Sequence, residues 1–303
     1  MRVVTLLPSA TEIVYALGVE PVGVSHECDY PPAASERPSV NRSRVDPTAD
    51  SAEINEQVAT AEDDGGVYAI ERETLARLEP DLIVTQGVCD VCAVDRVVVE
   101  DAVADLGLDA EVLTLDVHSL ADLYESIRRI GDATGRDERA ADLVDTLRAR
   151  VGAVESTAAA VEHTPSVAVL DWTDPVMVAG HWVPEMAEIA GGRYQLEDAG
   201  AHSRPREWAE IREYDPDVLV VSPCGFDLAQ IRENLGDVTD RPGWQDLTAV
   251  VDDRVVLVDG HHYVNRSGPR LVDTLEYLGW AIHPDLFERP PTDAVQPLSA
   301  IRQ

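Results

Sequence analysis

The sequence predicts an α/β protein of two lobes, each with a parallel sheet, joined by one long α-helix. Short apolar runs alternate with helical segments in both halves of the chain, and a stretch without strand signals separates the halves. This alternation is typical of parallel strands with helical crossovers. The expected division is an N-terminal lobe at 1–118, a helical linker at 119–163 and a C-terminal lobe at 164–303.

The N-terminal lobe opens with an apolar strand from Val3 to Leu7, which Pro8 ends. Ser9 and Glu12 have the spacing of a capping box, so Ser9 is expected to cap the first helix. Gly18 is expected to end that helix. Further strands are expected at 22–24, 81–85 and 111–115.

The linker is rich in Ala, Arg, Asp, Glu and Leu, and it lacks proline from 119 to about 160. Two apolar stripes predict two helices, the second of which begins near Arg136 and is long. In the C-terminal lobe, the pattern predicts strands at 167–170, 218–221 and 255–258, with helices at 185–190 and 267–282. Pro269 is expected near the start of the last helix.

A helix end, a Pro-Asp turn and a buried strand occur twice, at 75–84 and at 211–220. In open parallel sheets, ligands bind beyond the carboxyl ends of the strands. The loops that follow the strands are therefore the predicted ligand site. They are Pro8-Ser9, 26–30, 86–92, 172–182, 223–227 and 260–266.

Two kinds of side chain gather in these loops. Aromatic residues make up only 5% of the chain, yet many lie in or near these loops: Tyr30, Tyr68, Trp172, Trp182, Phe226 and Tyr263. Rings offer a large rigid surface to a flat or apolar ligand, and local packing is the alternative. The loops also contain His26, His181, His261 and His262, and neutral imidazole suits cobalt, iron or zinc.

Cys89 and Cys92 form a single C-x-x-C pair, and Cys28 lies in another strand-end loop. Metal binding, redox chemistry and plain packing all remain open for these thiols. The sequence contains no G-x-S-x-G, P-loop, H-E-x-x-H or G-x-G-x-x-G motif. We therefore expect a binding protein and no enzyme; a redox enzyme that uses the C-x-x-C pair is the third hypothesis.

The formal net charge is −33 and every basic residue is an arginine. Such a charge repels nucleic acid and anionic lipid, and screening by concentrated salt would relieve its self-repulsion. We therefore expect a halophilic setting, no nucleic-acid partner and a monomer. No export signal precedes the first strand and no apolar run is long enough for membrane insertion. The expectation is a cytoplasmic protein, or an extracytoplasmic one if the chain is a processed form.

Several segments together are specific to one family: Val4–Glu12, Pro21–Ser25, Asp29–Pro32, Leu78–Val84 and Arg266–Arg270. Over roughly residues 2–285 the chain resembles the substrate-binding component of vitamin B12 (corrinoid) ABC importers, within the wider iron-siderophore and haem-binding group. The resemblance implies Rossmann-like lobes on a rigid helix, the class III periplasmic-binding-protein fold. It also implies cobalamin or a related corrinoid in the inter-lobe cleft, an ABC-transporter permease as partner and no required cofactor.

The resemblance also implies roles for individual residues. Tyr30 matches an aromatic residue that contacts the ligand, and Arg266 matches an arginine that meets polar corrin substituents. Glu73 and either Glu207 or Glu210 match acidic residues that dock on the transporter. The chain departs from the family at Gln86, where relatives carry Trp, and at His262, which replaces an aspartate; Trp172 and Trp182 are expected to rebuild the aromatic wall.

The full predicted ligand site is Ser9, His26, Tyr30, Tyr68, Gln86, Trp172, His181, Trp182, Phe226, His262, Tyr263 and Arg266. The alternative function is a cytosolic protein that binds a metal, haem or a ferric chelate through Cys89, Cys92 and His26. In that alternative, Cys28 is a further candidate metal ligand.

Overall fold

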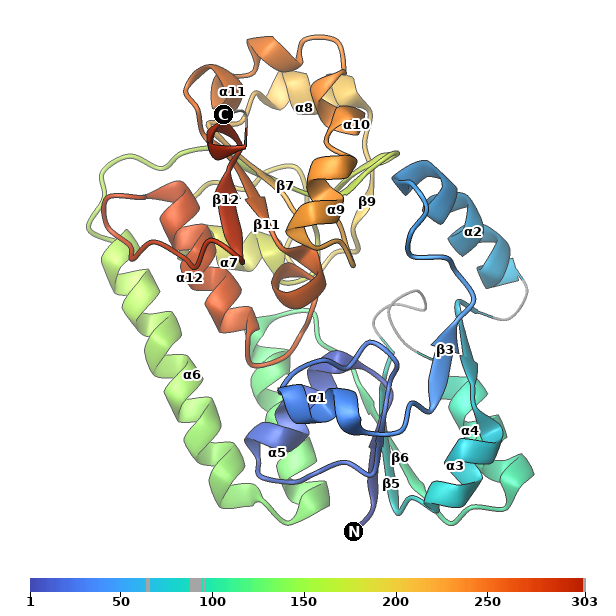
Figure 1. Cartoon of the computed structure of the whole chain (residues 1–303). Helices are drawn as coiled ribbons and strands as arrows, with labels where there is room; N and C mark the ends of the chain where they lie inside the picture. Colours follow the sequence, from blue (N-terminus) through green and yellow to red (C-terminus); the bar gives the residue numbers. More distant parts are fainter. Residues whose placement is uncertain (64–65, 88–93, 95, 302–303) are drawn as a thin grey trace. The chain divides into compact units, whose positions relative to one another are not determined.

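The computed structural model describes the whole chain except residues 64–65, 88–93, 95 and 302–303 (Figure 1). The chain divides into two compact units, Met1–Thr146 and Leu147–Gln303. The division falls within the long helix α6 (Asp137–Ala158). The three-part division at residues 118 and 163 remains a prediction. In the described part of the chain, no helix combines the length and the apolar character that a membrane crossing requires.

The first unit contains a four-stranded sheet in the order β2-β1-β5-β6, and all its pairs are parallel. Its strands are β1 (Val3–Thr5), β2 (Gly23–Val24), β5 (Leu82–Gln86) and β6 (Glu111–Leu115). A separate antiparallel pair consists of β3 (Asn41–Ser43) and β4 (Tyr68–Ile70). The helices are α1 (Pro8–Ala16), α2 (Ser51–Asp63), α3 (Arg72–Leu78), α4 (Arg96–Leu106) and α5 (Leu120–Thr134). A 3₁₀ turn covers Pro32–Glu36.

The predicted capping box at Ser9 is wrong. Helix α1 begins at Pro8, and its N-cap is Leu7, which offers no side-chain hydrogen bond. Proline suits the first helical position because its fixed φ is helical and the backbone N–H that it lacks has no partner there. Ser9 therefore lies inside the first turn and is buried. Gly18 follows the helix with φ +72°, as the stop signal predicted.

The second unit contains a six-stranded sheet in the order β12-β11-β10-β7-β8-β9. The central strands β11 (Val255–Val258), β10 (Val218–Val221) and β7 (Val167–Thr173) are parallel, as predicted. The edges are antiparallel: β12 (Val295–Pro297) on one side, β8 (Val176–Val178) and β9 (Arg204–Pro205) on the other. These edge strands are too short for the apolar pattern to reveal them.

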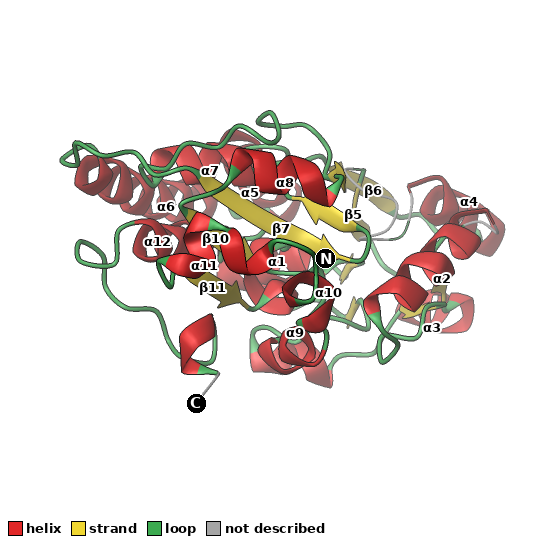
Figure 2. Cartoon of the chain, turned by 90° about the horizontal axis from the view of Figure 1, so that it is seen from above, coloured by secondary structure: helices red, strands yellow, loops and turns green. Residues whose placement is uncertain are grey.

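The helices of the second unit are α7 (Val183–Ile189), α8 (Trp208–Tyr214), α9 (Leu228–Glu233), α10 (Gly236–Thr239), α11 (Thr248–Val251) and α12 (Leu271–Ile282). Short turns lie at Trp244–Asp246, Gly260–Val264 and Leu298–Ala300. Figure 2 shows the helices in red and the strands in yellow. Helix α6 is fixed to α12 by Arg150, whose guanidinium donates to Asp273 at 2.5 Å and to Glu276 at 2.7 Å and 2.9 Å.

The repeat seen in the sequence is present in both units. Helices α3 and α8 both end at an acidic residue in the left-handed conformation, Glu79 with φ +40° and Asp215 with φ +44°. A Pro-Asp pair and a fully buried strand, β5 or β10, then follow. The same local pattern thus leads into a central strand of each sheet, and in open parallel sheets ligands generally bind in the loops beyond such strands.

Candidate functional site

In the first unit, His26 follows β2 and is held by Asn41 of β3. The Oδ1 atom of Asn41 accepts the backbone N–H of His26 at 2.9 Å and lies 3.1 Å from its Nδ1. Because this oxygen can only accept, Nδ1 carries a proton and Nε2 is the basic atom of the neutral ring. The Tyr68 ring packs at 5.5 Å from the imidazole. Tyr68 is the first residue of β4.

The other predicted residues of the first unit differ widely in exposure. Tyr30 is 47% exposed, whereas Gln86, the last residue of β5, is 9% exposed. Cys28 is buried, and its Sγ lies 3.0 Å from the Thr11 hydroxyl. Cys89 and Cys92 lie outside the described residues, so the proposed metal set of three cysteines stays a prediction.

In the second unit, the aromatic side chains pack the strand-end loops together. The Trp172 ring lies 5.2 Å from that of Phe226, and these residues are 8% and 3% exposed. The indole of Trp172 donates to the Asp174 carbonyl at 3.0 Å, and the indole of Trp182 donates to the Val264 carbonyl at 2.9 Å. This burial favours support of the loops over direct exposure to a ligand.

Asp171 is a buried carboxyl group near the carboxyl end of β7, and sequence reasoning missed it. Burial raises its pKa from 3.8 to about 6, although a hydrogen bond from Ser203 opposes the shift. The parallel register places Ser222 beside it, after β10. Among the described residues, Asp171 Oδ1 and Ser222 Oγ have no hydrogen-bond partner.

His181 lies where two backbone segments pass close to each other. Its φ is +51°, a left-handed conformation that is uncommon outside glycine. The preceding Gly180 is required there, because a Cβ would lie 2.2 Å from the Ala201 carbonyl. The His181 ring packs 5.5 Å from Trp182 and 5.0 Å from His202, a second imidazole that the predicted site did not include.

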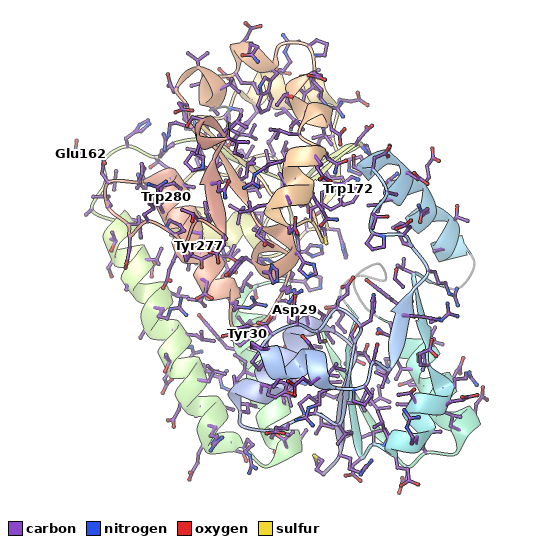
Figure 3. The ribbon with its side chains drawn as sticks, in the orientation of Figure 1. Asp29, Tyr30, Glu162, Trp172, Tyr277 and Trp280 are labelled. Carbon is purple, nitrogen blue, oxygen red and sulfur yellow. The ribbon has the colours of Figure 1, made fainter. Side chains whose placement is uncertain are left out.

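A short π-helical turn, Gly260–Val264, follows β11 and carries three consecutive rings. The buried Asp259 accepts the backbone N–H of His262 at 2.7 Å and lies 2.9 Å from its Nδ1. The buried Arg266 donates to Nε2 of His261 at 3.0 Å. The Tyr263 ring packs 5.1 Å from that of Tyr277 in α12, which Figure 3 labels.

The three acidic residues assigned to transporter docking occupy helix starts. Glu73 is exposed in the first turn of α3. Glu207 is the N-cap of α8, and its backbone N–H donates to Glu210 at 2.9 Å. Glu210 also pairs with Arg206 at 3.2 Å, so its carboxylate already stabilises the helix start. Their docking role remains a prediction.

The structure thus brings together some of the predicted residues within each unit. His26 contacts Tyr68, and Trp172 contacts Phe226. His181 contacts Trp182, and Arg266 lies in the same turn region as His262 and Tyr263. Sequence reasoning missed Asn41 and Asp259, which contact His26 and His262, and the buried Asp171. Asp259 was detectable as an Asp-x-x-His pair directly after a buried strand, whereas Asn41 is distant in sequence from His26.

Comparison with known proteins identifies the class. Residues 3–261 match the family described as periplasmic binding protein, so the chain belongs to that family. It is 27% identical to the uncharacterized ABC transporter substrate-binding lipoprotein YvrC of Bacillus subtilis (strain 168), over 95% of this chain and 81% of YvrC. It is also 27% identical to the vitamin B12-binding protein of Salmonella choleraesuis (strain SC-B67), over 48% of this chain and 43% of that protein.

The fold is also that of solved binding proteins. A periplasmic heme binding protein from Pseudomonas aeruginosa superposes with a TM-score of 0.72 at 22% identity, over 97% of this chain and 96% of that one. The chain is therefore an α/β solute-binding protein and not an enzyme, and it binds a ligand without needing a cofactor.

The expectation of a cytoplasmic protein is wrong. The family is one of periplasmic binding proteins, and YvrC is a lipoprotein. The inference failed because residues at the start of the first strand say nothing about the compartment in which the folded units work.

Proposed function

We propose that this protein binds cobalamin or a related corrinoid and delivers it to an ABC transporter. The similarity to a vitamin B12-binding protein and to an ABC transporter substrate-binding lipoprotein supports the ligand and the partner. The fold supports the location, since ligands of such sheets bind beyond the strand ends. Tyr30, with its exposed ring, is proposed as a contact for the flat face of the ligand.

The observation that carries the proposal is the turn after β11. It places two imidazoles, a phenol and a buried guanidinium within seven residues, Gly260–Arg266. A corrin offers a flat apolar face, a metal and polar side groups, and these match aromatic, imidazole and guanidinium groups in turn. Haem offers the same three features and is the second candidate ligand. The two imidazoles of the turn are the observation that favours haem.

The test is a titration of the full chain with cyanocobalamin, hemin and ferrichrome, each at low and at high salt. A ligand that binds only the folded state at a hundred times its Kd stabilises that state by about 2.7 kcal/mol. We expect cyanocobalamin to raise the melting temperature and to saturate at one molecule per chain. The absence of any thermal shift and any heat of binding with all three ligands would contradict the proposal.

A matched pair of variants tests whether the ligand binds at the turn after β11. Arg266→Gln removes the guanidinium of the turn and should weaken corrinoid binding about tenfold, by about 1.4 kcal/mol, as expected for a lost charge-assisted hydrogen bond. Arg232→Gln is the control, because Arg232 belongs to α9 and donates to Gln296. Equal weakening in both variants would place the ligand elsewhere.

A further inference from the structure

We propose that the second unit has a further binding site, for a short aliphatic diamine, in a groove beside the carboxyl end of α6. The groove has a volume of about 430 Å³. It is lined by the end of α6, the segment that follows it and the end of α7, all of which belong to the second unit. The proposal does not depend on the corrinoid function.

The groove lies at the opposite end of the sheet from the candidate ligand site. Gly191 lines it, and Arg193, two residues later, forms a parallel bridge with Ser166 directly before β7. Val167, the first residue of β7, donates its backbone N–H to the Arg193 carbonyl at 2.9 Å. Thr164, which precedes the same strand, also lines the groove. The groove is thus at the amino end of β7, whereas the candidate ligand site lies beyond the carboxyl ends of the strands.

Two exposed carboxylates line the groove, one from each helix. Glu155 lies in the last turn of α6 and Glu188 near the end of α7. Neither carboxylate forms an ion pair within the described part of the chain. Helix α6 has no basic residue in its last turn, and the carboxyl end of a long helix carries partial negative charge. Glu162, which Figure 3 labels, is exposed just beyond and adds to the negative charge. The groove therefore attracts a cation.

A metal ion matches these residues poorly. Calcium and magnesium take six or more oxygen ligands, or keep several waters around one or two carboxylates. Among the described residues, neither Glu155 nor Glu188 belongs to a group of three His, Cys, Asp or Glu side chains close enough to share an ion. The groove is also far larger than the volume of about 30 Å³ that one water molecule occupies. An organic cation is the better match.

The rest of the lining is mainly apolar. Ala158 is buried, and Val161 and Ile189 are half-buried. Gly191 leaves the space open, because a Cβ there would lie 3.0 Å from that of Ala158 and 2.8 Å from Nε2 of His283. Its φ of +84° also favours glycine. Such a surface stabilises a hydrocarbon chain by removing it from water.

The combination of groups selects the class of ligand. Each cationic end of a diamine can pair with one of the two carboxylates, while the methylene chain covers the apolar lining. A protein partner matches less well, because specific protein interfaces bury about 1,000 Å² or more. Small-molecule sites of about 300–1,000 Å³ include the volume of this groove. The proposed ligands are therefore free aliphatic diamines, of which putrescine is the probe.

The experiment is a calorimetric titration of the full chain with putrescine at low salt. We expect saturation at one molecule per chain. Butylamine, which has the same hydrocarbon chain and a single amino group, should bind about threefold more weakly, as expected for the loss of one exposed ion pair. At equal ionic strength, Mg²⁺ should not displace putrescine. The affinity should fall as salt rises, since exposed charges are screened.

Four variants locate the site. Glu155→Gln and Glu188→Gln should each weaken binding about threefold, and the double variant about tenfold. Ala159→Phe fills the groove without changing the charge, because Ala159 is exposed and lines it, and should abolish binding. Glu233→Gln is the matched control, since it removes one exposed charge from α9, outside the groove, and should leave binding unchanged.

Three results would overturn the proposal. Wild type that binds no putrescine at low salt has no such site. Equal weakening by Glu233→Gln and Glu155→Gln, or normal binding by Ala159→Phe, would mean that the net charge of −33 alone attracts the diamine. Displacement by Mg²⁺ at equal ionic strength would replace the diamine by a metal ion. Cyanocobalamin binding should be the same in wild type and in the groove variants, so this proposal and the corrinoid function are tested separately.

Discussion

The two units share a local repeat but bury different kinds of polar group. In the described part of the first unit, the buried polar side chains are mainly hydroxyls and amides, and Glu12 is the ionisable exception. The second unit buries Asp171, Glu197, Asp259, Arg266 and His283. The same architecture therefore supports one unit with a largely neutral interior and one whose interior depends on charge.

This difference determines which unit has a folding stability that depends on pH. Hydroxyls such as Thr85, which donates to the Val94 carbonyl at 2.7 Å, keep their hydrogen bonds over a wide pH range. Buried ionisable groups must be paired or must shift their pKa, so their contribution to stability depends on pH. The second unit should accordingly determine how the stability of the whole chain responds to pH and to loss of a charge.

The largest effect is expected from Glu197→Gln. The Glu197 side chain is 2% exposed and accepts from Arg204 at 2.6 Å and 3.0 Å and from Arg206 at 3.2 Å. Burial opposes its ionisation, but hydrogen bonds from Arg204 and from the Asp198 backbone N–H, together with the charges of Arg204 and Arg206, outweigh burial and lower its pKa. Removal of the carboxylate takes from the largely buried Arg206 its buried counter-charge and leaves only the partly exposed Glu210. We expect a loss of about 4 kcal/mol in the free energy of unfolding at pH 7.

The control for this variant is Arg204→Gln, because the Arg204 side chain is 60% exposed and an exposed ion pair contributes about 1 kcal/mol or less. A carboxyl group with a lowered pKa stabilises the fold above its unfolded pKa, and this contribution is lost as pH falls through the folded pKa. The gap between wild type and Glu197→Gln should therefore shrink in acid. Chemical unfolding at pH 7 and below pH 4 measures it, and equal losses in both variants would contradict the charge argument.

Sequence patterns predicted the regular core of both units. The strands 218–221 and 255–258 are observed at the predicted residues, because continuous buried apolar runs leave little ambiguity. The helix predicted at 267–282 begins only at Leu271, since the Ser-Gly-Pro segment before it forms a turn. The antiparallel edges and the β3–β4 pair were missed, because they are short and are defined by their neighbours.

For the candidate site, sequence reasoning named the aromatic and imidazole rings but not the groups that hold them in place. His26 and His262 were predicted from their position after strands, and this logic needs only the order of elements along the chain. Arg266 was predicted from the family resemblance. The contact between His26 and Asn41 depends on β3 and could not be read from spacing. Trp172 and Phe226 were predicted as a ligand wall, and their burial against each other is a property of packing that composition does not reveal.

Asp171→Asn should have the second largest effect on the free energy of unfolding. It should raise this free energy at pH 7, whereas Glu197→Gln should lower it. The folded-state pKa of Asp171 is raised from 3.8 to about 6 by burial, so the native state binds a proton more tightly than the unfolded state. Wild-type stability should therefore fall as pH rises from about 4 to about 6 and stay lower above that range. The asparagine variant avoids the buried charge and should be about 3 kcal/mol more stable at pH 7.

Urea unfolding at pH 4, 5, 6 and 7 tests the predicted direction in which stability changes with pH. The curve of stability against pH should flatten in Asp171→Asn relative to wild type, and the two proteins should converge near pH 4. Asp285→Asn is the control, because Asp285 is exposed and its replacement should leave the pH dependence unchanged. A destabilised Asp171→Asn at pH 7 would mean that the carboxylate is stabilised by an ion or a group that outweighs its burial.

The smallest effect belongs to the neutral interior of the first unit. The Thr11 hydroxyl lies 2.6 Å from that of Thr5 and 3.0 Å from Cys28 Sγ, and it donates to the Leu7 carbonyl at 3.1 Å. Thr11→Val keeps the shape of the side chain and removes the hydroxyl. A net loss of about 1 kcal/mol is expected, as for a buried neutral hydrogen bond.

That loss should be the same at pH 5 and pH 7, in contrast to the effect of Asp171→Asn. Thr60→Val provides the comparison, since the exposed Thr60 bonds within its own helix, to the Glu56 carbonyl at 2.9 Å. Its loss should stay within about 0.5 kcal/mol. A Thr11→Val loss that changed with pH by as much as the Asp171→Asn effect would break the contrast. The pH response would then belong to the chain as a whole, and the charged interior of the second unit would no longer explain it.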